Sequence, residues 1–244
     1  MKLNKFELGG GLLLFLLLIF LFFSLKIPFF EILDFDFSFR NLITDVLLSF
    51  FRVLATTLLA MVAGIILGYL FFHFKFLNKL FMPSINFIRH ISPFAWLPFA
   101  IVWFGLGETP IAFIMFITLF FPSLIAATDI FSNIPREYFD EAEVSGANKF
   151  QIFSAIEIPL TIPNFINLFR IIWGLGWSTI IAAEMLGVPS GLGFRLLDFR
   201  YLLKYKNMLH YLIIMGTLGI IIDYCLEKLY FLMKGFPGIL RKTD

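Results

Sequence analysis

Long apolar runs alternate with short polar connections along almost the whole chain. The runs cover about 11–25, 46–72, 85–105, 110–130, 165–187 and 208–233. A transmembrane helix needs roughly 20 mostly apolar residues to cross a bilayer. The pattern therefore predicts an all-α polytopic membrane protein with about six transmembrane helices.

The first run has charged residues before it, as the h-region of a signal peptide does. It follows Lys2 and Lys5, but no small-x-small cleavage site comes after it. We therefore expect an uncleaved transmembrane helix over 1–28. The amphipathic segment 29–45 carries charges that do not suit hydrocarbon, so we expect it at the outer interface. Its charged residues include Glu31, Asp34, Asp36 and Arg40.

The distribution of lysine and arginine favours one orientation in the membrane. Basic residues are more frequent in the connections that share a side with the two termini, which places both termini in the cytoplasm. The basic segment 195–206 falls on the opposite side and reduces this bias. Residues 234–244 would then form a cytoplasmic tail.

Composition excludes several classes of protein. With 60% hydrophobic and 15% charged residues, the chain has too much apolar surface for one water-soluble core. The net charge of +2 is spread thinly, without the basic and aromatic clusters of a nucleic-acid surface. The single cysteine, Cys225, excludes a disulfide within the chain.

The longest polar connection, 131–163, predicts two short helices. Pro135 suits a first helical turn, acidic residues follow it, and Gly146 interrupts the run. The second helix would end before Pro159 and carry an apolar stripe. The stripe consists of Phe150, Phe153 and Ile156. Such a hairpin is either a docking element or a surface cover for its own bundle.

Ionisable residues within the runs are candidates for a translocation path. Glu184 lies deepest; it either lines a path or gate, or is hydrogen-bonded to a neighbouring helix. Arg52, Arg89 and Arg170 lie nearer the ends, where an arginine reaches the interface without needing a solute. Trp177 is a further candidate, with packing as its alternative role.

Motifs for nucleotide binding and for hydrolysis in the membrane are missing from the sequence. It contains no Gly-x4-Gly-Lys-Ser/Thr phosphate loop, no His-Glu-x2-His pair and no Gly-x-Ser-x-Gly turn. The chain therefore lacks the means to bind ATP phosphates by itself, and a membrane-embedded enzyme is disfavoured. We expect no cofactor and no metal on this chain.

The hairpin resembles the cytoplasmic loop of type I ABC importer permeases. That loop has the pattern Glu-Ala-Ala-x3-Gly-x9-Ile-x-Leu-Pro, and the spacing of its Gly, Ile and Pro is intact here. Asp140 stands where the family has Glu, and Glu141 stands where it prefers Ala. The matching positions are Asp140, Glu141, Ala142, Gly146, Ile156 and Pro159.

Other segments resemble the branch of this family that imports aliphatic sulfonates, taurine, nitrate or thiamine precursors. The similarity covers about 41–233 and keeps the family's order. The segments are 48–54, Pro83, 89–108, Phe169-Arg170, Trp177, 182–186 and Gly191-Leu-Gly193.

The resemblance implies a permease core at 46–233, whose loop 131–163 couples to a separate ABC ATPase. That partner would bind ATP and Mg²⁺. Further expected partners are a periplasmic or lipid-anchored solute-binding protein, membrane lipid and a second permease copy, with the bacterial cytoplasmic (inner) membrane as the location. The rival interpretation is a channel or carrier that needs no ATPase, in which the hairpin merely caps the bundle.

Overall fold

The computed structural model describes residues 38–234, and every regular element there is a helix. The expected first span at 1–28, residues 29–37 and the tail after Lys234 lie outside this range. The helices are α2 (Phe39–His73), α3 (Lys75–Arg89), η2 (Pro93–Trp96), α4 (Leu97–Phe104), α5 (Glu108–Ser132), α6 (Arg136–Val144), α7 (Lys149–Ile152), η3 (Phe153–Glu157), α8 (Ile158–Gly187), α9 (Leu192–Tyr201) and α10 (Tyr205–Lys234).

Within the described range, four helices are long and apolar enough to cross a membrane. They are Phe39–His73, Glu108–Ser132, Lys149–Gly187 and Tyr205–Lys228. Each coincides with most or all of one apolar run seen in the sequence, so the all-α, multi-span architecture is confirmed.

The apolar run at 85–105, expected to form one span, is interrupted in the structure. The chain instead forms α3 and then the pair η2 and α4, bent by 89° at the break between them. Pro93 favours an extended conformation for Ser92, whose ψ is 128°. The helix that begins at Lys75 therefore ends at Arg89, and the segment is a broken span or a re-entrant loop.

Helix α2 begins at Phe39, earlier than the boundary expected at residue 46. Residues 39–45 thus form its first turns and are continuous with the span. Asp45 is buried in this part of the helix, where it accepts hydrogen bonds from Arg195 and Tyr211. These two hydrogen bonds compensate for the burial of the Asp45 carboxylate within the long helix.

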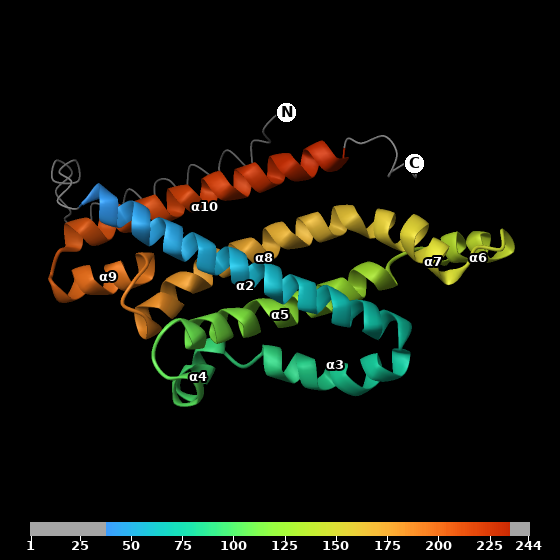
Figure 1. The fold of residues 1–244 in the computed structure, drawn as a ribbon, viewed down its shortest axis with the longest axis horizontal. Coiled ribbons are helices and arrows are strands. Elements are labelled where there is room, and N and C mark those ends of the chain that lie inside the picture. Colours follow the sequence, from blue (N-terminus) through green and yellow to red (C-terminus); the bar gives the residue numbers. More distant parts are fainter. Residues whose placement is uncertain (1–37, 235–244) are drawn as a thin grey trace, which may run out of the picture.

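Helices α2, α5 and α8 form the centre of the bundle (Figure 1). Gly64 and Gly68, four residues apart on α2, lie directly against α5. A Cβ atom at Gly64 would lie 2.8 Å from Ser123 Cβ, and one at Gly68 would lie 2.7 Å from Ala127 Cβ. The small-xxx-small pattern therefore brings these two helices into close contact.

The bundle is elongated, with different elements at its two ends. Helices α6 and α7 project at one end, and α9 lies at the other (Figure 1). We call these the hairpin end and the α9 end. Between them, large apolar side chains such as Leu59, Val62 and Val102 are exposed on the surface, as expected of a protein that contacts lipid.

Candidate functional site

The hairpin end carries the two short helices expected from the sequence. α6 ends at Val144, and Gly146 has φ +75°, a conformation that glycine adopts without strain. The N–H of Ala147 donates to the carbonyl of Ala142 at 3.0 Å and closes the turn. Asn148 and Gln151 then form a capping box that starts α7.

The second arm of the hairpin does not end before Pro159, which corrects the sequence prediction. α7, the π-helix η3 and α8 form one continuous helix from Lys149 to Gly187. Pro159 lies in the first turn of α8, directly after η3. A proline removes one backbone hydrogen bond and crowds the preceding turn. The wider turn of a π-helix just before Pro159 accommodates both effects.

The predicted apolar stripe is divided between two environments. Phe150 is 75% exposed, whereas Phe153 and Ile156 are half-buried against the bundle. Asp140 and Glu141 are exposed on α6, and Ala142 is half-buried. Phe150 and the acidic residues of α6 therefore face outward. Phe153 and Ile156 instead pack the hairpin against the bundle.

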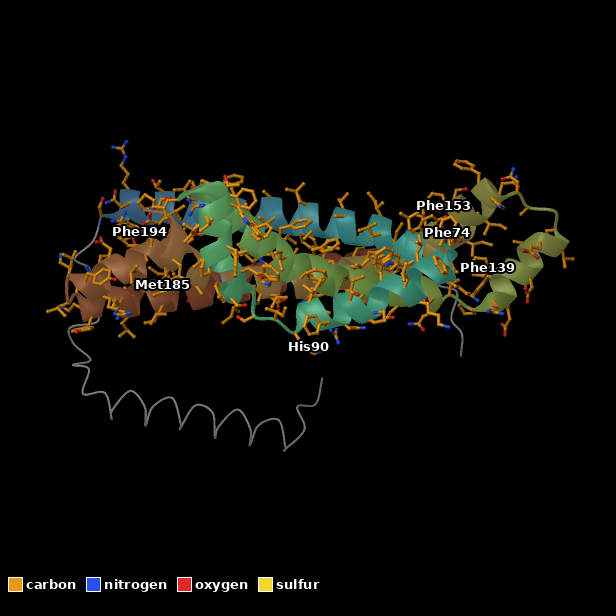
Figure 2. The ribbon with its side chains drawn as sticks, turned by 90° about the horizontal axis from the view of Figure 1, so that it is seen from below. Phe74, His90, Phe139, Phe153, Met185 and Phe194 are labelled. Carbon is orange, nitrogen blue, oxygen red and sulfur yellow. The ribbon has the colours of Figure 1, made fainter. Side chains whose placement is uncertain are left out.

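Aromatic contacts anchor the hairpin to the end of α2. The ring of Tyr69 lies 5.4 Å from that of Phe153 and 5.2 Å from that of Phe131 at the end of α5. The ring of Phe72 lies 6.4 Å from that of Phe139 on α6. Figure 2 shows Phe153 and Phe139 together at this end of the molecule.

A cavity of about 870 Å³ lies between the hairpin and the ends of α2 and α5. Its lining includes charges of both signs and aromatic rings. The lining includes Tyr69, His73, Lys75, Arg136 and Glu157.

At the α9 end, Glu184 is fully buried and completely surrounded by donors. Ser49 donates to its carboxylate at 2.8 Å, the Gly193 N–H donates at 2.8 Å, and Arg52 Nη1 donates at 2.6 Å. The alternative in which Glu184 is hydrogen-bonded to a neighbouring helix describes this geometry.

Arg52 uses all five of its N–H groups in this cluster. Nη1 donates to Glu184 and to the Ser190 carbonyl, Nη2 donates to Ser190 Oγ and Glu108, and Nε donates to Glu108. Glu184 is buried, but the Glu108 side chain is 63% exposed. The outer carboxylate is therefore the more accessible partner of this arginine.

Two glycines allow the start of α9 to approach the buried carboxylate. Gly191 has φ +98°, and a Cβ atom there would lie 2.3 Å from Glu184 Oε1. At Gly193, a Cβ atom would lie 2.1 Å from the Ile181 carbonyl oxygen. The Gly191-Leu-Gly193 segment thus brings the N-terminus of α9, with its partial positive charge, onto Glu184.

Sequence reasoning found Arg52 and Glu184 but missed their partners. Ser49, Glu108 and Ser190 come from three separate segments, and no pattern along the chain links them. The glycine pair after Glu184 is the one sequence signal that points to a close backbone approach.

A second ion pair holds the basic segment at this end. Arg195 Nε donates to Asp45 at 3.0 Å, and Nη1 lies 3.5 Å from Asp198. Burial disfavours the charge on Arg195, but the hydrogen bond and attraction of Asp45 outweigh it, so the pKa of Arg195 is raised above its ordinary value. Part of the basic segment 195–206 is thus paired.

The remaining path candidates lie apart from this cluster. Arg170 forms a bidentate pair with Asp223 on α10 at 2.7 and 2.8 Å. Trp177 on α8 is buried against α10 and donates to the Met215 carbonyl at 3.2 Å. Arg89 is exposed at the end of α3. The structure therefore brings together only Arg52 and Glu184 from the expected set.

A family model described as the binding-protein-dependent transport system inner membrane component matches residues 60–232. The chain belongs to this family. The resemblance to type I ABC importer permeases is thereby confirmed, and the chain is an ABC importer permease, a multi-pass membrane protein that serves as a transporter component.

Curated relatives agree with this assignment. A putative ABC transporter permease of Methanocaldococcus jannaschii is 33% identical over 198 residues, which cover 80% of this chain and 74% of the relative. The nitrate import permease NrtB of Synechococcus elongatus is 35% identical over 159 residues, 65% of this chain and 57% of the relative. The bicarbonate transport permease CmpB of the same organism is 31% identical over 186 residues, 75% of this chain and 66% of the relative.

Among solved structures, a chain of the inward-facing MetNI methionine ABC transporter has the same fold. The TM-score is 0.64 at 18% sequence identity, and the match covers 80% of this chain and 99% of that chain.

Proposed function

We propose that this permease moves a small oxyanion into the cytoplasm by alternating access, driven by a separate ABC ATPase that docks on the hairpin at 136–159. The main observation in support of this proposal is that the second arm of the hairpin is continuous with a membrane span. The helix Lys149–Gly187 has 39 residues, which corresponds to a length of about 58 Å at 1.5 Å per residue. A rigid element of this length transmits a displacement at Phe150 to the Glu184 cluster.

The exposed face of the hairpin supports ATPase docking. An aromatic side chain that is 75% exposed, Phe150, lies beside the acidic α6 helix, outside the apolar surface of the spans. Large exposed aromatic residues are frequent anchors in protein interfaces. ATP and Mg²⁺ belong to the partner in this proposal.

The names of two relatives support the solute class. These proteins are described as permeases for nitrate and bicarbonate, which are both small oxyanions. An organosulfonate such as taurine carries a similar anionic group. A pyrimidine-type thiamine precursor is the alternative from the same branch.

The proposed assembly contains two permease copies, most simply a homodimer, around a central path. A periplasmic or lipid-anchored binding protein would deliver the solute to the α9 end. The hairpin and both termini would then lie in the cytoplasm of the inner-membrane assembly. A glycosylation or reporter-fusion map with junctions at Gly146 and at Lys204 tests this orientation.

The test of the function is reconstitution with an ABC ATPase and a solute-binding protein from the same organism. We expect ATP-dependent uptake of radiolabelled nitrate, bicarbonate or taurine into proteoliposomes. Uptake without ATP would favour the channel or carrier that needs no ATPase, and uptake of only a thiamine precursor would overturn the oxyanion assignment.

The hairpin is tested by Gly146→Val. A β-branched residue strains the φ of +75° at this position, and no atom outside the immediate chain neighbours lies within 4 Å of a Cβ placed there. We expect the ATPase to dissociate while the protein stays inserted. Undiminished transport would contradict docking at the hairpin.

A further inference from the structure

Glu157 is a buried carboxylate at the base of the hairpin that the proposed function does not yet use. It is the last residue of the π-helix η3, and only 3% of its surface is exposed. It lies at the junction of the projecting hairpin and the span α8, and it lines the cavity beside the end of α2.

The neighbours of this carboxylate come from α2. His73 Nε2, in the last residue of α2, lies 3.7 Å from Glu157 Oε1. Tyr69, one helical turn earlier, lines the same cavity as Glu157. Glu157 Oε2 has no hydrogen-bond partner among residues 38–234.

Packing requirements do not account for a glutamate here. Burying a carboxylate with an unsatisfied oxygen is unfavourable, and an apolar side chain of the same size would fill the space without that penalty. Aromatic contacts from Tyr69, Phe153 and Phe131 already hold the surrounding elements together. A π-helical turn also often marks a functional position within a longer helix.

We infer that Glu157 is a positioning residue for energy coupling, which joins movement of the hairpin to movement of α2. This inference rests on the proposed ATP-driven transport. Through α8, the hairpin reaches Glu184, and through Glu157 it reaches the end of α2.

The far part of α2 carries Ser49 and Arg52, which both bond Glu184. Glu157 therefore completes a closed connection in which α2 and α8 are joined at both ends. The aromatic rings already hold α2 against the hairpin, and the Glu157 contact adds a polar link through which a displacement of the hairpin reaches α2.

The surroundings of Glu157 leave room for its contact to change. The adjoining cavity also presents Lys75 and Arg136, whose positive charges complement the unpartnered oxygen. Lys75 and Arg136 would thus be the alternative partners of Glu157 after a shift of the hairpin.

The experiment compares Glu157→Met and Glu157→Gln with the wild type in the complete reconstituted complex. Thermal unfolding, solute-stimulated ATP hydrolysis and uptake per ATP are measured for each. Asp129→Met, which replaces an exposed carboxylate near the end of α5, is the matched control.

We expect Glu157→Met to keep or raise the melting temperature and to lower solute-stimulated hydrolysis about fivefold or more, within the usual range of coupling between sites. Glu157→Gln, which keeps a polar group, should retain more coupling than Glu157→Met. The control should behave as wild type.

Full stimulation and full uptake per ATP in Glu157→Met would overturn the inference and leave the proposed function intact. A wild-type complex without ATP-dependent uptake would overturn both. If Glu157→Met does not fold, His73→Gln tests the same contact from α2. Normal coupling in that variant would equally overturn the inference.

Discussion

Arg52 Nη1 lies 2.6 Å from Glu184 Oε1, and this pair joins α2 to α8 where α9 begins. Its two members lie 132 positions apart in sequence. Both are satisfied by further hydrogen bonds, so the pair is a structural junction of the bundle as well as a candidate gate.

Removing one member of this pair leaves a buried charge without its counter-ion. We expect Glu184→Ala to lower the free energy of unfolding by about 3 kcal/mol or more. Glu108→Ala removes the exposed partner and should cost about 1 kcal/mol or less. Thermal or denaturant unfolding in detergent measures both, and equal losses would contradict the assigned difference in burial.

The glycine at the start of α9 is required for close packing. We expect Gly193→Ala to destabilise the protein by about 1–3 kcal/mol, because the added Cβ would lie 2.1 Å from a backbone oxygen of α8. Gly174→Ala is the control, since no atom outside its own helix backbone and immediate chain neighbours lies within 4 Å of its Cβ position. Comparable melting temperatures for the two variants would refute this account of the glycine.

The contact between α2 and α5 depends on Gly68. Gly68→Val should separate the two helices and destabilise the protein by about 1–3 kcal/mol, because its first side-chain atom already lies 2.7 Å from Ala127 Cβ. Double replacement with Ala127→Gly should recover part of the loss. Unfolding measurements on the three variants form a double-mutant cycle, and no recovery would argue against direct contact.

Phe150 is expected to contribute to ATPase binding and not to stability. Because its side chain is 75% exposed, Phe150→Ala should change the free energy of unfolding by about 0.5 kcal/mol or less. The affinity of the complex should fall at least about fivefold, as for an interface residue worth 1 kcal/mol or more. Half-buried Phe153 provides the contrast, since Phe153→Ala should reduce stability as well. Co-purification and unfolding of each variant distinguish the two roles.

Hydropathy predicted the spans formed by α2, α5, α8 and α10 because each is a long apolar helix. It did not foresee the break within 85–105, because mean hydropathy does not register the backbone effect of Pro93. The rule that helices stop at proline wrongly ended the hairpin before Pro159. The rule does not foresee a π-helical turn that accommodates the proline.

The polar clusters were predictable only in part. Glu184 stood out as a charge inside an apolar run, and Gly146 stood out as a helix break. The partners of Arg52 depend on how α2, α5 and the loop before α9 meet, and that arrangement is a tertiary property.

The π-helix at Phe153–Glu157 is equivalent to one residue inserted into an α-helix. One residue corresponds to about 100° of rotation about the helix axis at 3.6 residues per turn. This single position therefore sets which side of the hairpin faces outward relative to α8. Deleting Ser154 or Ala155 would leave the contact residues in the sequence yet turn Phe150 toward a different side of the membrane helix. The partner would then meet another surface.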